Sequence, residues 1–109
     1  MTVKELAAEC GFEIIRAPDE HREVRGAYIG DLLSWVMGKA RADDAWITIM
    51  SNVNVIAVAS LSDVSCVIFA EGVRPADDII ATAEQKGINL LGTALSAYDT
   101  AIKLSGVLK

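Results

Sequence analysis

The residues of this chain that could do chemistry do not form a catalytic or metal-binding set. Nucleophilic catalysis needs a base beside a Ser, Cys or Thr, and His21, the one histidine, lies in a charged stretch typical of an exposed loop. Cys10 and Cys66 are far apart and provide no metal-ligand spacing. Adjacent acidic pairs, Asp43-Asp44 and Asp77-Asp78, are explained by a turn and a helix start. The sequence therefore predicts no catalytic residue, no metal site and no cofactor.

Patterns for phosphate chemistry are also missing. The sequence has no Gly-x-x-x-x-Gly-Lys run, and the spacing of Gly26 and Gly30 is better explained by strand crowding and a turn. A receiver-like phosphoacceptor would need a Lys after the last strand, and residues 88–93 contain none. Inherited phosphate chemistry is therefore not expected.

Polar residues do cluster where expected strands turn into helices. In open α/β sheets, ligands bind outside the carboxyl ends of the strands, so these turns are the candidate ligand-binding positions. They would supply backbone amides, hydroxyls, side-chain amides, two carboxylates and one guanidinium, although the same residues could be only caps and turns. The candidates are Gly30, Asp31, Asn52, Asn54, Glu71, Gly72, Arg74, Thr93 and Ser96.

Hydrophobic periodicity and turn signals predict the elements that would position these turns. Thr2 and Glu5 form a capping-box pattern, Asp31 is a suitable N-cap, and Pro75 suits a first helical position. We expect helices at 2–10, 32–40, 75–86 and 94–104, and strands at 12–15, 24–29, 46–50, 65–69 and 88–91. Residues 17–25 should form an exposed loop.

The run 55–61 is ambiguous, because its residues also permit a strand. We favour a helix capped by Asn54, since a crossover between parallel strands needs about a dozen residues and this interval supplies them. Residues 46–104 then alternate β-α-β-α-β-α, and right-handed crossovers would make these strands parallel. The predicted fold class is α/β, a three-layer sandwich around a small, mostly parallel sheet.

Composition limits the classes of partner. The 109 residues match a single domain, 1–109, are 52% hydrophobic and carry a net charge of −5. This charge, without a Lys/Arg run, argues against nucleic acid. No apolar stretch approaches the roughly 18 residues of a membrane span, and the start of the chain does not resemble a signal peptide. We expect a cytoplasmic protein that binds neither nucleic acid nor a membrane.

Several apolar residues are assigned by their neighbours. Cys10 and Cys66 each lie beside apolar residues, which favours two buried thiols over a disulfide. Trp35, Trp46 and Met37 are expected in the core rather than in a stacking platform. The apolar helix 32–40 should be extensively covered, or else buried between subunits.

Three ordered segments resemble the DRTGG domain. Val24-Arg25-Gly26-Ala27-Tyr28-Ile29-Gly30 is similar to that family's Val-x-Gly-x-x-Val-Gly opening, and Gly72-Val73-Arg74-Pro75 to its Gly-x-x-Pro helix entry. Ala83 to Thr93 looks like its Ala-x-x-x-Gly-Ile-x-Val-Leu-x-Thr segment. The resemblance covers about residues 5–105. It implies a fold like the N-terminal domain of HPr kinase/phosphorylase, and kinship with regulatory or dimer-forming modules of CBS-domain pyrophosphatases and long phosphotransacetylases.

The signature that names the family is altered here. Asn52-Val53-Asn54 stands where an Asp-Arg pair would be expected, and Ala70-Glu71-Gly72 replaces Thr-Gly-Gly. Losing the Arg and a Gly-rich amide turn, while gaining a carboxylate, makes a phosphate pocket less plausible.

These observations leave three hypotheses of function. The first is a non-catalytic regulatory or protein-interaction module that self-associates as a homodimer. The second is a module that binds a small polar metabolite or nucleotide at the strand-end turns. The third is a small enzyme completed by a partner subunit, for which His21 is the one weak candidate.

Overall fold

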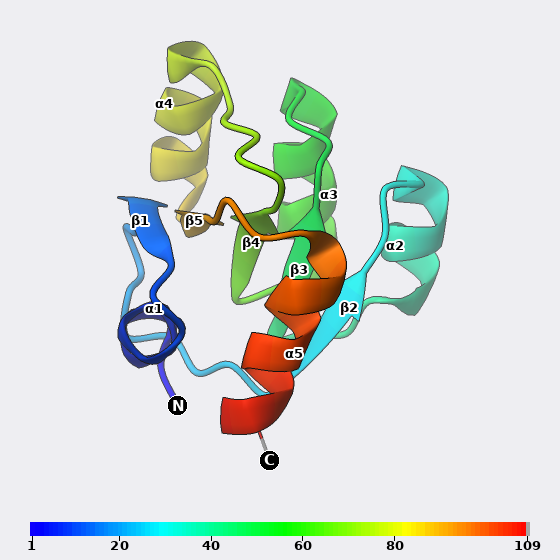
Figure 1. Cartoon of the computed structure of the whole chain (residues 1–109). Coiled ribbons are helices and arrows are strands. Elements are labelled where there is room, and N and C mark those ends of the chain that lie inside the picture. Colours follow the sequence, from blue (N-terminus) through cyan, green and yellow to red (C-terminus); the bar gives the residue numbers. More distant parts are fainter. Residues whose placement is uncertain (109) are drawn as a thin grey trace.

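The computed structural model describes residues 1–108, which form a five-stranded sheet with helices on both faces (Figure 1). The strand order is β1-β5-β4-β3-β2; β1 runs antiparallel to β5 and the other neighbours are parallel. The predicted α/β class with a mostly parallel sheet is confirmed. In chain order the elements are α1 (Val3–Cys10), β1 (Glu13–Arg16), β2 (Gly26–Ile29), α2 (Leu33–Lys39), β3 (Asp44–Thr48), α3 (Val53–Ser62), β4 (Cys66–Phe69), α4 (Asp77–Lys86), β5 (Leu90–Gly92) and α5 (Ala97–Val107).

Two apolar clusters fill the spaces between the three layers. Helices α2, α3 and α4 pack on one face of the sheet, with Trp46 and Phe69 among the strand residues that they cover. Helices α1 and α5 pack on the other face, over Ile47 and Ile68. The strands β3, β4 and β5 are buried along their whole length, which is why apolar residues follow one another in them instead of alternating with polar ones. Strand β3 has polar residues only at its two ends, Asp44 and Thr48.

The helix starts follow capping chemistry that the sequence shows only in part. The Thr2–Glu5 capping box before α1 is confirmed, with the Thr2 amide donating to Glu5 at 2.9 Å. Helix α3 forms where a helix was favoured, but its N-cap is Asn52 rather than Asn54, because Asn52 has extended backbone and its side chain accepts the Asn54 amide. The capping-residue prediction there was wrong by two positions.

Other predicted starts also differ from the structure. Asp31 does not cap α2; Leu32 holds the N-cap position without a side-chain bond, because the Asp31 carboxylate accepts from Thr48 and Ile49 instead. Pro75 precedes α4, whose N-cap is Ala76 in extended backbone. Helix α5 begins at Ala97 rather than at 94, because Ser96 supplies its cap. Strand β3 begins two residues before its predicted start, and strands β2 and β5 begin two residues after theirs.

Helix α2 is less covered than its sequence predicts. Its side chains Trp35 and Met37 are 58% and 52% exposed, and within α2 Val36 is the buried residue. The helix has only seven residues and packs mainly against α3 near the β2 side of the sheet, so it buries a single face. The core assignment was wrong for Trp35 and Met37 and right for Trp46, whose indole donates to the Gly30 carbonyl at 2.9 Å.

The loop between β1 and β2 is tied to the sheet. Arg22 bonds Asp43 at 3.0 Å and Asp63 at 2.9 Å. Partial burial acts to lower the pKa of Arg22, but the hydrogen bonds to the two carboxylates outweigh it and raise the pKa overall. Asn89, almost fully buried, exchanges two bonds with the backbone of Asp19. This loop is therefore exposed, as predicted, but fixed at both ends.

Both cysteines are unpaired and buried, as favoured from the sequence. Burial raises the pKa of the Cys66 thiol to about 12, and desolvation also raises the pKa of Cys10. The histidine, His21, is 76% exposed, with Glu20 at 3.6 Å. No helix within residues 1–108 is long and apolar enough to cross a membrane.

Candidate functional site

The carboxyl ends of the parallel strands β2 to β5 lie along one edge of the sheet. Because β1 is antiparallel, it enters at this same edge, and its first residue, Glu13, is in register with Gly92 at the end of β5. Sequence reasoning missed Glu13, since a pairing between residues so far apart in the chain leaves no local signal. The edge therefore carries a carboxylate that the candidate list lacked.

The turns after β4 and β5 are bonded directly to each other. The Glu71 amide donates to the Leu95 carbonyl at 2.8 Å, and the Gly72 amide donates to the Thr93 carbonyl at 2.9 Å. Glu71 and Gly72 have φ values of 60° and 73°, so both adopt the left-handed conformation that favours glycine. Three of the candidates, Glu71, Gly72 and Thr93, are thus brought together.

A depression of about 470 Å³ opens where these two turns meet β1. Gly72, Arg74 and Thr93 line it together with Gly11 and Glu13. The Arg74 guanidinium bonds Glu13 at 2.6 Å, and both side chains are about half exposed, at 54% and 56%. An exposed pair of this kind contributes about 0–1 kcal/mol, so a ligand could replace either partner at small cost.

The depression offers donors and acceptors of several kinds. The Thr93 hydroxyl oxygen accepts the Leu95 amide at 3.2 Å, which leaves its own O–H to donate to a ligand. Arg74 has further N–H groups besides the one that bonds Glu13. The site can therefore bind an anionic group at Arg74, an amine at Glu13 and a polar oxygen at Thr93.

The remaining candidates do not line this depression, and several of them have structural partners. Gly30 and Asp31 belong to the β2–β3 end of the edge, where Asp31 accepts from the Thr48 hydroxyl at 2.8 Å and from the Ile49 amide at 3.0 Å. Asn52 and Ser96 cap α3 and α5. Asn54 lies exposed in the first turn of α3. The four turns thus share one edge, but only two of them, after β4 and β5, form a common depression.

Within residues 1–108, no three His, Cys, Asp or Glu side chains gather where they could hold a metal ion. The charged groups that line the depression are Arg74 and Glu13, and they are already paired. The depression thus presents one cationic and one anionic group beside hydrogen-bonding groups.

The sequence matches the DRTGG domain over residues 3–107. This chain belongs to the DRTGG domain family. A solved structure of the CBS and DRTGG domains of the regulatory region of Clostridium perfringens pyrophosphatase, complexed with the activator diadenosine tetraphosphate, has a similar fold. The TM-score is 0.74 at 13% sequence identity, over 94% of this chain and 45% of that one. The chain thus spans about half the length of that regulatory structure. A search of curated proteins found no match.

In this DRTGG domain, the residues of the altered signature have defined structural roles. Asn52, in the segment where the Asp-Arg pair would be expected, caps α3. Glu71 and Gly72, which replace the Gly pair, both have the left-handed conformation. The turn after β4 therefore has two consecutive left-handed residues, one of which carries a carboxylate.

Proposed function

We propose that this DRTGG domain is a non-catalytic regulatory module that binds a small polar ligand in the depression between Glu13, Arg74 and Thr93. The observation that carries the proposal is the exposed Arg74–Glu13 pair, which lines a hollow of about 470 Å³ at the carboxyl edge of the sheet. That volume lies in the range of small-molecule sites. Ligands in open α/β sheets bind at this edge.

The charges of the site favour one class of ligand. A zwitterion or a hydroxyl-rich acid could place its anionic group on Arg74 and its amine or hydroxyl groups near Glu13 and Thr93. A polyphosphate is less suited, because Glu13 and the chain's net charge of −5 repel it. The related regulatory region is complexed with diadenosine tetraphosphate, so adenine nucleotides belong in the test beside amino acids and sugar acids.

The non-catalytic part of the proposal rests on the surroundings of the reactive groups. Cys66 is fully buried and its pKa is raised to about 12, which disfavours the thiolate that a nucleophile needs. His21 is exposed on the loop before β2 rather than in the depression. The third hypothesis, an enzyme completed by a partner, therefore has little support in the described residues.

Thermal unfolding against a panel of amino acids, sugar acids, nucleosides and nucleotides tests the proposal. A ligand at ten times its Kd adds about 1.4 kcal/mol of stability, which should raise the Tm by several degrees. Arg74→Ala and Thr93→Val should abolish the shift. Arg16→Ala is the matched control, because Arg16 forms an exposed ion pair with Glu84 from the same strand β1 but does not line the depression. No shift with any compound, or an equal loss in all three variants, contradicts the proposal.

A further inference from the structure

The two outermost strands of the sheet, β1 and β2, are protected to different degrees against pairing with another strand. Strand β1 carries Glu13 and Arg16, both in ion pairs, and its register with β5 is irregular. Charged residues and irregular register are common protections of an edge strand against pairing. Strand β2, Gly26-Ala27-Tyr28-Ile29, has no charged residue and a regular register with β3. Its outer side therefore remains able to pair with another strand.

Apolar surface borders β2 on the α5 side. Ala27 and Ile29 are in register with the buried Ala45 and Ile47, so they face the α5 layer. Both are nevertheless exposed, Ile29 by 47%. Between β2 and α5 lies a hollow of about 360 Å³, whose α5 side is formed by residues such as Ala101 and Leu108. The helix α5 thus leaves the β2 side chains uncovered.

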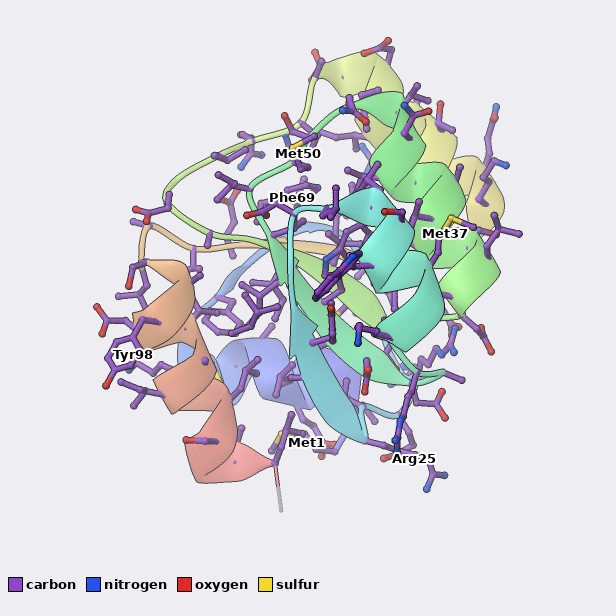
Figure 2. The ribbon with its side chains drawn as sticks, turned by 90° about the vertical axis from the view of Figure 1, so that its right-hand side faces the viewer. Met1, Arg25, Met37, Met50, Phe69 and Tyr98 are labelled. Carbon is purple, nitrogen blue, oxygen red and sulfur yellow. The ribbon has the colours of Figure 1, made fainter. Side chains whose placement is uncertain are left out.

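Helix α2 adds apolar surface on the other side of β2. Figure 2 shows β2 facing the viewer between α5 and α2, with no helix across it. Leu32, just before α2, is 61% exposed, and Trp35 is 58% exposed. The open strand is therefore flanked on both faces of the sheet by side chains that gain from being covered.

The charges at the two ends of β2 indicate what covers it. Arg25 precedes the strand and, although its Nε lies 3.3 Å from an Asp43 carboxylate oxygen, its side chain is 73% exposed. Asp31 follows the strand and is also exposed, although its Oδ1 atom accepts from Thr48 and Ile49. In an antiparallel pair of two β2 strands centred on Tyr28, each Arg25 lies opposite the other copy's Asp31. The same register sets the small Ala27 opposite the large Ile29 in the space of the α5-side hollow. One surface is thus complementary to itself, as a two-fold interface requires.

We propose that a second copy of this chain pairs antiparallel with β2 about a two-fold axis at Tyr28, which makes one sheet continuous across both copies. The pairing satisfies the outward backbone groups of β2 and covers Ile29. It uses a surface outside the Glu13–Arg74 depression and does not depend on the proposed ligand.

Light scattering after size exclusion, at tens of micromolar, tests the pairing. The wild-type protein should have twice the chain mass of 11.6 kDa. Ile29→Lys, which places a charge in the interface, should give the monomer mass. Ile14→Lys is the matched control, because Ile14 lies on the opposite edge strand and is similarly exposed at 43%. A wild-type monomer, or a dimer that survives Ile29→Lys, overturns the proposal.

A cross-link tests the register. In an antiparallel ladder the Cα atoms of opposite residues are about 4.5–5.5 Å apart, a distance that a disulfide can span. Tyr28→Cys should therefore form a covalent dimer under mild oxidation, while the native Cys10 and Cys66 are buried and remain reduced. Ile14→Cys should stay uncross-linked. If the Tyr28→Cys protein dimerises but does not cross-link, the two-fold axis does not lie at Tyr28. If the protein is a monomer that binds a foreign peptide along β2, a second copy is not the occupant.

Discussion

Glu71 occupies a backbone conformation that its side chain disfavours. Its φ of 60° is left-handed, which costs a residue with a Cβ roughly 1–2 kcal/mol. A glycine there removes that cost. It also makes the unfolded chain more flexible, which lowers the free energy of unfolding by about 0.5–1 kcal/mol. We therefore expect Glu71→Gly to raise the free energy of unfolding by about 0.5 kcal/mol, measured by urea denaturation.

Asp63 serves as the contrasting position. Its φ of 58° is also left-handed, but its carboxylate bonds Arg22 at 2.9 Å and aspartate tolerates this conformation better than most residues. Asp63→Gly should therefore lower the free energy of unfolding. The strain argument would be contradicted if Glu71→Gly lowered the free energy of unfolding, or if both glycine substitutions raised it equally.

Glu5 makes the start of α1 sensitive to acid. Its pKa lies below the ordinary 4.5 because the Thr2 backbone amide donates to its carboxylate, with a further contribution from the Thr2 hydroxyl. A group whose pKa is lowered in the folded state adds stability above its unfolded pKa, and that stability is lost as pH falls through the folded pKa. As the pH falls from about 5 to about 3, the free energy of unfolding should therefore decrease less in the Glu5→Gln variant than in the wild-type protein.

Urea denaturation at a series of pH values measures this difference. Thr2→Ala removes the hydroxyl but keeps the backbone amide that donates to Glu5, so Glu5→Gln should keep most of its effect on the pH dependence in that background. If the variant and wild type lose stability in parallel as pH falls, the capping box is not responsible.

At the scale of elements, the cap of α3 distinguishes two neighbouring asparagines. The Asn52 side chain accepts the Asn54 amide at 3.0 Å, whereas Asn54 is exposed inside the first turn. Asn52→Ala should therefore cost about 1 kcal/mol of unfolding free energy, typical of a lost N-cap. Asn54→Ala should change stability by much less, because alanine is the better helix former. Equal losses in denaturation experiments would contradict the assignment of the cap.

The same asparagines show how far the sequence could predict the elements. Hydrophobic runs fix the existence of a helix or strand, because burial favours a definite period, and every predicted element is present. Both Asn52 and Asn54 are suitable caps, so local chemistry did not choose between them. The choice depends on where β3 ends, and the Asp31 bonds to Thr48 and Ile49 hold that end of β3. Such tertiary contacts are invisible in a local pattern.

The candidate site was predictable to a similar extent. The turns at Gly72, Arg74 and Thr93 were found because parallel strands must end at one edge. Glu13 was missed, because its place depends on the antiparallel pairing of β1 with Gly92. Sequence reasoning thus identifies the edge, and only the sheet order identifies which of its turns share a depression.

For the whole molecule, the two cysteines lie in regions of different expected stability. Cys66 begins the fully buried strand β4, between β3 and β5 and beneath helices on both faces. Cys10 ends α1, at the start of the chain and near the edge strand β1. Terminal segments often open locally at a smaller free energy than central strands. The thiols can therefore report two different opening reactions of one fold.

Thiol labelling should separate these reactions. A thiol reagent attacks the exposed thiolate, and Cys66 is fully buried with a pKa raised to about 12. In Cys10→Ala, labelling of Cys66 should therefore require global unfolding, so the free energy from labelling rates should equal that from urea denaturation of the same variant. In Cys66→Ala, labelling of Cys10 should give a smaller free energy than urea does, because release of α1 suffices. If Cys66 is labelled at a free energy below that of global unfolding, the central strands open without the rest of the molecule, and the sheet is not the last part to unfold.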